Sequence, residues 1–322
     1  MTPVRTALLL LLALAPQAAA EPVTILAEPV PSFARLSSAE SFGPFAWRGG
    51  LTLSSPEERF GGLSGLVLGP DCEELLAVSD RGNWLSGRLS YEGGRLSGFA
   101  AAEMTPVLDS KGRPQRNKAW GDAEALARLA DGRIALGFES RVRFGTYDVA
   151  GDGLAARFRA VPHPKEIDSG PENAEVESLG QLPDGRFIAI SEGQFDEGGK
   201  IRAWAWKGRK AAAFTLARFG DYRVTDLAVT ADGDVLTLER RFTSTSLPGM
   251  ALRRFPASRI EHGASLEPEL LLEVTAPLHV IDNMEGLALC ERDGETRVTL
   301  MSDDNFNRSL QSTVLLQFAY RP

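Results

Sequence analysis

The sequence has few of the side chains that most often carry enzyme chemistry. Its 322 residues include only two cysteines and three histidines. Cys72 and Cys290 lie far apart and form no C-x-x-C pair, and the histidines show no H-x-x-H or H-E-x-x-H spacing. A zinc site is therefore not expected.

The chain also lacks clusters of Lys and Arg and long apolar runs. It carries 35 basic and 43 acidic residues, which gives a formal net charge of −8. An acidic chain without a basic patch gives no reason to expect nucleic acid or an anionic membrane surface as partner. After the first twenty residues, no stretch reaches the roughly 18 uninterrupted apolar residues that a transmembrane helix needs. We therefore expect neither nucleic acid nor a membrane as partner.

The first twenty residues have the pattern of an export signal. Arg5 supplies the positive charge, residues 7–15 (ALLLLLALA) form a short apolar stretch, and residues 18–20 are a small-residue cleavage site. Cleavage after Ala20 would leave residues 21–322 as one exported domain, which we expect in the periplasm or secreted. In such an oxidising compartment two cysteines favour one disulfide.

A repeat organises the rest of the chain. Its five copies are GLSGLVLGPDCEELLAVSDRG (62–82), DAEALARLADGRIALGFESR (122–141), EVESLGQLPDGRFIAISEG (175–193), VTDLAVTADGDVLTLERR (224–241) and NMEGLALCERDGETRVTLMSDDN (283–305). Each copy consists of two apolar strands around a tight turn. In four copies the turn contains Asp-Gly, which suits a type I′ hairpin because its twist matches that of paired strands.

The spacing of the copies predicts an all-β fold, a β-propeller of five to six four-stranded blades around a central channel. Equivalent positions lie 49 to 60 residues apart, which is too long for one hairpin and fits a four-stranded blade. Radial stacking would bury both faces of each blade. We count five repeats, and residues 23–47 and 313–320 are left over. We expect these to share a blade and close the ring, although a sixth, degenerate blade stays open.

Ring closure would make the first and last blades neighbours. Cys72 lies in the turn of the first copy, and Cys290 ends the first strand of the last copy. We therefore predict a disulfide between Cys72 and Cys290, the alternative being two buried free thiols.

Acidic residues recur at both ends of the repeated hairpins. Most copies open on an acid, and the openers are Ser64, Glu124, Glu177, Asp226 and Glu285. Every copy closes on one, and the closers are Asp80, Glu139, Glu192, Glu239 and Asp303. Because the turn lies at the other end of each hairpin, these residues should surround one rim of the axial channel. Crowded carboxylates raise one another's pKa or need a counter-ion, such as a nearby arginine or a hard cation like Ca²⁺, which binds carboxylate and amide oxygens.

A simpler interpretation of these acids stays open. Carboxylates at strand ends often cap backbone N–H groups or pair with arginines in a structural network. The densest cluster, Asp303-Asp304-Asn305, is the strongest single candidate for a cation site, followed by Asp122 with Glu124.

The motifs GLSGL, SDRG, EALA, DGR, NMEGLAL and SDDNF, spread over about residues 40–320, resemble the phytase-like family of exported bacterial proteins ("esterase-like activity of phytase"). The resemblance implies a propeller that hydrolyses esters or phosphoesters. The positions that match the family's motifs are Asp80, Arg81, Glu124, Glu177, Glu285, Asp303, Asp304 and Asn305.

Three functions stay open. The first is a calcium-dependent hydrolase of small esters or phosphoesters, active as a monomer, with Glu285, Glu124 and Arg81 in catalysis. Its expected cation ligands are Asp303, Asp304, Asn305, Asp80, Glu177, Glu192, Glu239 and Asp226. The second is a non-catalytic periplasmic ligand- or protein-binding propeller, because no nucleophile–base motif is present. The third is a lactonase similar to the calcium propellers of the gluconolactonase type.

Overall fold

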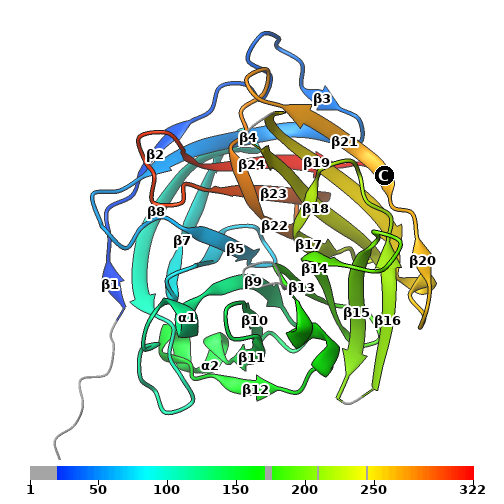
Figure 1. Cartoon of the computed structure of the whole chain (residues 1–322). Coiled ribbons are helices and arrows are strands. Elements are labelled where there is room, and N and C mark those ends of the chain that lie inside the picture. Colours follow the sequence, from blue (N-terminus) through cyan, green and yellow to red (C-terminus); the bar gives the residue numbers. More distant parts are fainter. Residues whose placement is uncertain (1–19, 171–175, 209, 244–245) are drawn as a thin grey trace, which may run out of the picture.

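Five sheets stand around a central axis (Figure 1). The computed structural model describes residues 20–170, 176–208, 210–243 and 246–322. The predicted β-propeller is confirmed, and the number of blades is five. Residues 1–19 of the predicted export signal (1–20) lie outside the described residues, and the signal stays a prediction.

The first two blades follow the chain from the axis outward. Blade 1 contains β5 (Leu63–Leu68), β6 (Glu74–Ser79), β7 (Asn83–Glu92), β8 (Arg95–Pro106) and β1 (Glu21–Pro22). Blade 2 contains β9 (Ala123–Arg128), β10 (Ile134–Phe138), β11 (Arg143–Tyr147) and β12 (Arg159–Val161). Its flanking turns are α1 (Lys118–Gly121), α2 (Val149–Asp152) and the 3₁₀ turns η1 (Gly153–Ala155) and η2 (Lys165–Ser169).

Blades 3 and 4 repeat the arrangement. Blade 3 contains β13 (Ser178–Gln181), β14 (Phe187–Phe195), β15 (Ile201–Lys207), β16 (Lys210–Leu216) and the parallel edge strand β20 (Ser265–Leu266). Blade 4 contains β17 (Arg223–Val229), β18 (Asp234–Thr243), β19 (Ser246–Pro256) and β21 (Glu269–Thr275), with the 3₁₀ turn η3 (Ala257–Arg259) after β19.

Blade 5 joins the two ends of the chain. It contains β22 (Asn283–Arg292), β23 (Glu295–Asp303), β24 (Thr313–Tyr320), β4 (Phe45–Ser54) and β2 (Leu26–Pro29), with β3 (Ser41–Phe42) paired to β4. The C-terminal β24 pairs antiparallel with the N-terminal β4, seen in Figure 1 as red and blue ribbons side by side. The expectation that the leftover strands share the closing blade is therefore confirmed.

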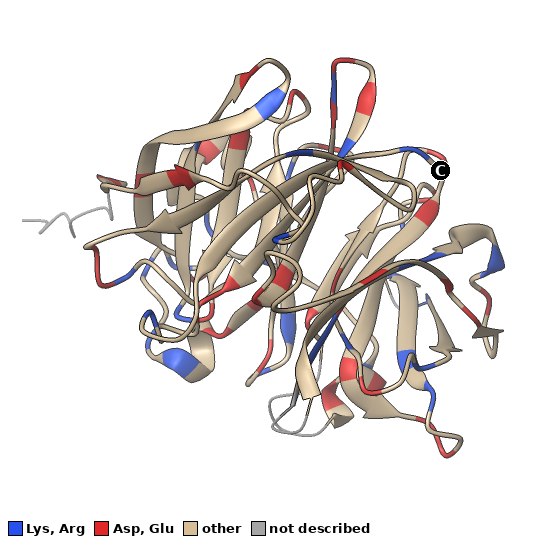
Figure 2. Ribbon diagram, turned by 90° about the horizontal axis from the view of Figure 1, so that it is seen from above, with Lys and Arg blue, Asp and Glu red and all other residues tan. Residues whose placement is uncertain are grey.

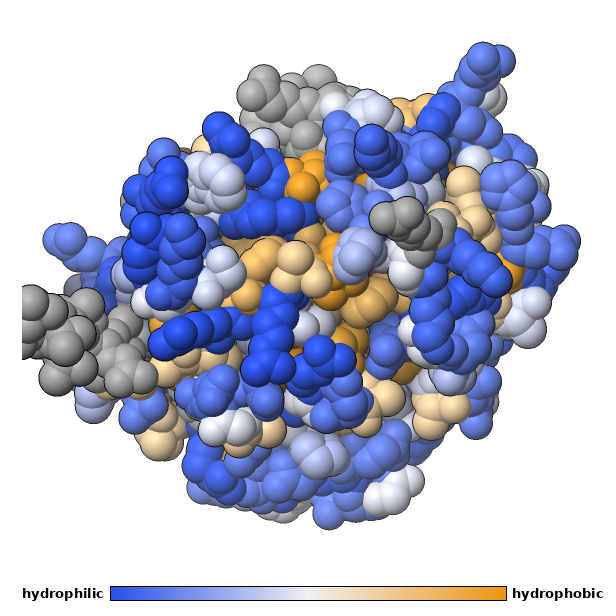
Figure 3. Space-filling view, turned by 90° about the horizontal axis from the view of Figure 1, so that it is seen from below, coloured by the Kyte–Doolittle hydropathy of each residue, from blue (hydrophilic) through white to orange (hydrophobic). Residues whose placement is uncertain are grey.

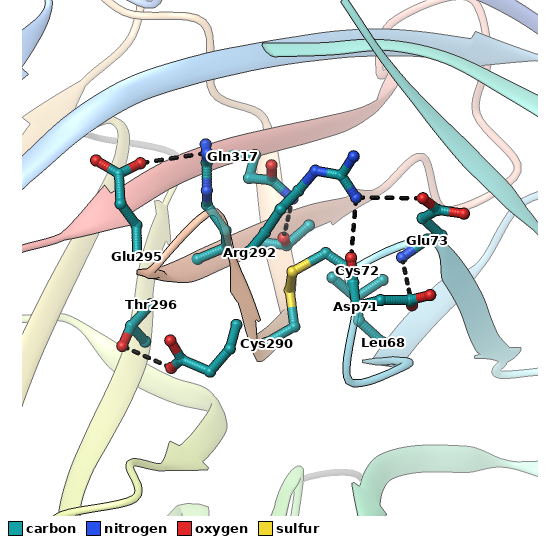
Figure 4. The surroundings of a disulfide bond; sticks show 12 residues. Leu68, Asp71, Cys72, Glu73, Cys290, Arg292, Glu295, Thr296 and Gln317 are labelled. Atoms are coloured by element: carbon teal, nitrogen blue, oxygen red, sulfur yellow. Dashed lines mark hydrogen bonds and ion pairs between the residues drawn. A yellow bond between two sulfur atoms is a disulfide. The ribbon is translucent and has the colours of Figure 1, made fainter. Parts of the chain in front are cut away.

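The predicted disulfide is also confirmed. Cys72 and Cys290 are bonded, with 218 residues between them in sequence (Figure 4). The bond joins the β5–β6 turn of blade 1 to β22 of blade 5 and so fastens the two blades at which the ring closes.

Each interface between adjacent blades has its own apolar core. Five separate clusters of buried side chains fill the five interfaces, and each draws residues from two neighbouring blades. The surface seen in Figure 3 is mostly hydrophilic, with apolar side chains gathered in small patches between polar ones. Among the described residues, no helix is long and apolar enough to cross a membrane.

A cluster of partly buried ion pairs links the strands of blade 5, in which the ring closes. Arg48 on β4 donates to the two carboxylate oxygens of Glu295 on β23 at 2.8 and 2.6 Å, and Arg321 donates to Glu295 at 2.8 Å. The hydrogen bonds from Arg48 and then Arg321 lower the pKa of Glu295 to about 2. The carboxylate thus links strands from both ends of the chain.

Glu295→Gln is expected to lower the free energy of unfolding by about 1–2 kcal/mol at pH 7. Because the folded-state pKa is depressed, this stabilisation is present above the unfolded value near 4.5 and is lost as the pH falls toward about 2. Urea unfolding of wild type and variant at pH 7 and pH 3 measures it. Glu92→Gln, at an exposed position, is the control. A gap between wild type and Glu295→Gln that is the same at both pH values would contradict the prediction.

Candidate functional site

The five inner strands enclose an axial cavity of about 130 Å³. Each blade contributes three consecutive residues of its inner strand to the wall. The lining segments are residues 66–68, 126–128, 179–181, 227–229 and 287–289. Residues at the same place in these five segments are therefore structurally equivalent. Two residues before each segment, at one end of the cavity, stand Ser64, Glu124, Glu177, Thr225 and Glu285.

A β-bulge marks this level in four blades. The pairing of β5 with β6 skips from Leu63 to Gly65, and that of β22 with β23 skips from Met284 to Gly286. The same skip in β9 and β17 leaves one residue unpaired in each strand. The unpaired residues are Ser64, Glu124, Thr225 and Glu285, while Glu177 directly precedes β13. A bulge re-aims its side chain, which explains how a strand residue turns toward the axis.

The expectation that Asp226 and Glu239 stand on this rim is wrong. Asp226 lies one residue beyond the bulge and accepts hydrogen bonds from the backbone N–H groups of Leu227 at 2.8 Å and Leu287 at 2.7 Å. Glu239 is fully buried and pairs with Arg253 on β19 at 2.7 Å. Glu239 therefore links two strands of blade 4, and Asp226 links blade 4 to β22 of blade 5, as the simpler interpretation of strand-end carboxylates predicts.

Blade 4 therefore presents a cation where the other blades present acids. Strand pairing makes Arg240 the equivalent of Asp80, Glu139, Glu192 and Asp303. Its guanidinium lies 2.9 Å from Glu285 and 3.4 Å from Glu192, and it donates to the side-chain oxygen of Asn283. Asn283 in turn donates to Glu285 at 2.6 Å. Arg240 thus links carboxylates of blades 3 and 5 across the mouth.

Carboxylates from three blades are close enough to influence one another. Burial, then the charges of Glu177 and Glu285, raise the pKa of Glu124 well above its usual value. Burial, then the charge of Glu192, does the same for the pKa of Glu177. Burial and Glu285 raise the pKa of Asp303 to about 8. Acidic residues occur throughout the ring (Figure 2). Glu124, Glu177 and Asp303 differ from most of them because they lie near the axis, where the charges of other carboxylates raise their pKa.

Three carboxylates form the arrangement best suited to a metal ion. Among the described residues, Asp122, Glu124 and Glu139 each offer an oxygen, and these oxygens lie within 4.8 Å of one another. Asp122 is buried, with Ser140 donating to its Oδ2. Its Oδ1 is buried without a hydrogen-bond partner, and so is Oδ1 of Asp80. Such unpartnered oxygens are costly unless a cation compensates them, so this donor set fits a hard cation such as Ca²⁺.

In the predicted cation cluster Asp303-Asp304-Asn305, both carboxylates accept hydrogen bonds from backbone N–H groups. Asp304 accepts hydrogen bonds from the backbone N–H groups of Gly62 at 3.2 Å and Phe306 at 3.0 Å. Asp303 accepts from the N–H of Asn305 at 2.7 Å. Of the three residues, Asp303 is the one whose pKa is raised, by burial first and then by the charge of Glu285.

Arg81 lies at the same mouth, with its guanidinium carbon 3.4 Å from the centroid of the Phe306 ring. Among the described residues it has no ion-pair partner. Lys118, by contrast, pairs with Asp80 and Asp122. No sequence pattern pointed to this residue, because it lies outside the repeat.

Fold and site together define a five-bladed propeller with a candidate cation-binding centre at one end of its axis. The chain belongs to the Phytase-like family, described as "esterase-like activity of phytase", whose profile matches residues 58–306. The resemblance seen in the sequence is thereby confirmed.

Solved structures show more distant likenesses. A protein of unknown function from Dyadobacter fermentans is 12% identical, with 92% of this chain and 91% of that chain covered and a TM-score of 0.45. An α-L-arabinofuranosidase from Clostridium thermocellum is 10% identical, with 77% and 84% covered and a TM-score of 0.46. A gluconolactonase from Xanthomonas campestris is 11% identical, with 95% and 99% covered and a TM-score of 0.43. No curated protein matches the chain.

Proposed function

We propose that this propeller is an exported, cation-dependent hydrolase of small esters or phosphoesters, acting as a monomer at the acidic end of its axis. The observation that carries the proposal is the group Asp122, Glu124 and Glu139, with oxygens within 4.8 Å of one another and a buried, unpartnered Oδ1 on Asp122. The Cys72–Cys290 disulfide suits a compartment outside the cytoplasm.

The donor set consists of carboxylates alone, which favours Ca²⁺ over softer metals. Asp122, Glu124 and Glu139 would hold the ion, and Asp80 stands next to them through its shared contact with Lys118. When bound, the ion would polarise the carbonyl or phosphoryl oxygen of the substrate. Glu177, whose charge acts on Glu124, completes the wall on the blade 3 side.

Glu285 is our candidate for the general base. Its Oε1 is held by Asn283 at 2.6 Å and by Arg240 at 2.9 Å, which fixes the carboxylate in one orientation. Burial raises the pKa of Glu285, while Arg240 and Asn283 keep the ionised form accessible. Glu285 would take one proton from water as the water oxygen bonds to the carbonyl carbon or phosphorus, and the ester oxygen would leave with the bond's electron pair.

Arg240 and Arg81 would receive negative charge on the substrate. Arg240 already lies between Glu285 and Glu192, so one edge of its guanidinium orients the base. Arg81 has no carboxylate partner among the described residues and lies on the Phe306 ring at the rim. A guanidinium stacked on a ring keeps its in-plane donors free for an anion.

The test uses the mature chain and a panel of generic esters and phosphomonoesters. Chelation is expected to abolish turnover, and added Ca²⁺ to restore it. Glu285→Gln is expected to reduce kcat by about 10²–10⁴-fold because it removes the base. Asp71→Asn, an exposed turn position at the opposite end of the hairpins, is the matched control and should keep full activity.

Two results would overturn the proposal. Turnover that survives chelation would remove the cation from the reaction. Absence of turnover across the whole panel, combined with saturable binding of a ligand at the rim, would instead establish a non-catalytic binding propeller.

A further inference from the structure

A loop lies over the edge of the candidate cation site. The chain leaves blade 1 at the end of β8, passes through the four-residue turn α1 and enters β9 of blade 2. Lys118, the first residue of α1, reaches from this loop to two carboxylates. Its Nζ lies 2.9 Å from Oδ2 of Asp80 and 3.6 Å from Oδ1 of Asp122, although 64% of its side chain is exposed.

The two carboxylates belong to different blades and each has an incompletely satisfied oxygen. Oδ1 of Asp80 is buried without a hydrogen-bond partner, and Lys118 contacts the other oxygen, Oδ2. Oδ1 of Asp122 is also without a hydrogen bond, and the ammonium of Lys118 lies 3.6 Å from it. Lys118 therefore supplies positive charge to both carboxylates without satisfying either buried Oδ1 by a hydrogen bond.

We propose that Lys118 is a tethered competitor of the bound cation, which occupies the edge of the Asp122–Glu124–Glu139 site and weakens the affinity of that site for Ca²⁺. This inference rests on the cation site proposed above, but it does not depend on hydrolysis. An ammonium in contact with Asp122 repels a divalent ion held by the same carboxylate. Because the lysine is exposed and flexible, the ion can displace it into solvent.

The expected consequence is a site tuned to weak, exchangeable binding. Extracellular calcium modules bind their ion with dissociation constants of about 10⁻⁴–10⁻³ M, and ligand charge count is one of the two factors that set such values, with the rigidity of the site. A site walled by this many carboxylates would otherwise bind much more tightly. Lys118 subtracts one unit of negative charge from it without contributing a ligand.

The experiment is calorimetric titration of Ca²⁺ into the mature chain and three variants. Lys118→Gln is expected to bind Ca²⁺ about tenfold more tightly than wild type, and the gain should shrink at high salt. Lys118→Arg keeps the charge and should bind like wild type. Lys111→Gln removes one exposed lysine from the same loop and is the matched control, since among the described residues its side chain has no ion pair.

A second readout needs no bound ion. Without Ca²⁺, Lys118→Gln should melt at a lower temperature than wild type, because Asp80 and Asp122 lose their counter-ion. With saturating Ca²⁺ the two should melt together. Lys111→Gln should follow wild type in both conditions.

The outcomes separate this inference from the proposed function. Tighter binding by Lys118→Gln supports the inference whether or not any ester is hydrolysed. Binding by wild type that Lys118→Gln leaves unchanged or weakens overturns the inference alone. If neither protein binds Ca²⁺ at millimolar concentration, the cation site is wrong, and both the inference and the cation-dependent function are overturned.

Discussion

Arg240→Gln is expected to lower the free energy of unfolding by about 3 kcal/mol and kcat/KM by about 10³-fold. The guanidinium lies 2.9 Å from Glu285 and 3.4 Å from Glu192, and both carboxylates are largely buried. Removing it leaves these acids facing each other and Glu177 without the cation that lowers its pKa. Part of the loss in activity would come from the base, since Arg240 orients Glu285. Urea unfolding and steady-state kinetics on the best substrate of the panel measure the two effects.

Arg241→Gln is the matched control for this variant. Arg241 is the next residue on β18, but its nearest carboxylate oxygen, on Glu273, is 3.9 Å away, and it stacks on the ring of Tyr222. A change of less than about 1 kcal/mol is expected there. Arg240→Lys should recover part of the stability and little of the activity, because an ammonium cannot bridge two carboxylates as the planar guanidinium does. An Arg240→Gln protein as stable and active as wild type would rule out this role.

The pair Arg240 and Glu285 can be separated further by a double-mutant cycle. In Glu285→Gln, the arginine still has Glu192 and Asn283 as partners, so the loss of stability should be smaller than in Arg240→Gln. The double variant should be more stable than the sum of the single losses predicts, by about 1–3 kcal/mol, because the buried repulsion disappears with the second acid. Additive losses would mean that the two side chains act independently.

The propeller could be predicted from the sequence because its signals are local and repeated. Four of the five inner hairpins turn at Asp-Gly. Only Asp293-Gly294 has positive φ at both residues, as the predicted type I′ turn requires, so the turn type is wrong in the other three. The spacing of the hairpins sets the number of strands per blade. Closure followed from the leftover strands at the two ends of the chain, and β24 indeed pairs with β4. The Cys72–Cys290 bond followed from closure rather than from any local pattern around the cysteines.

The rim could be predicted only in part, because one residue of register decides which way a side chain points. The fourth repeat reads VTDLAV, and the likeness of Asp226 to the acids of the other copies predicts it as the opener. The pairing of β17 with β18 places the bulge at Thr225 instead, and Glu239 is drawn away by Arg253 on the next strand. These partners are set by strand pairing and by packing across the sheet, which the repeat pattern does not contain.

Lys118, the counter-ion at the edge of the site, could not be predicted from the sequence for a different reason. Lys118 lies in a loop between blades, and such loops differ in length and sequence from one repeat to the next. Its two partners, Asp80 and Asp122, belong to different blades, and only the ring geometry brings them within 4 Å of one ammonium.

Replacing both cysteines, Cys72→Ala with Cys290→Ala, is expected to lower the free energy of unfolding by about 3–5 kcal/mol. The cross-link spans 218 residues, so it removes far more conformational freedom from the unfolded chain than a short loop would. It also acts where the ring closes, between blade 1 and blade 5, in which β4 pairs with β24, and both cysteines lie in the apolar core between these blades. Urea unfolding of the oxidised protein, the reduced wild type and the double variant separates the cross-link from packing, since the reduced protein keeps both sulfur atoms. Reduced wild type and double variant should agree within about 1 kcal/mol, because a Cys to Ala change removes little volume. If the double variant unfolds at the same urea concentration as the oxidised protein, the pairing of β4 with β24 alone closes the ring.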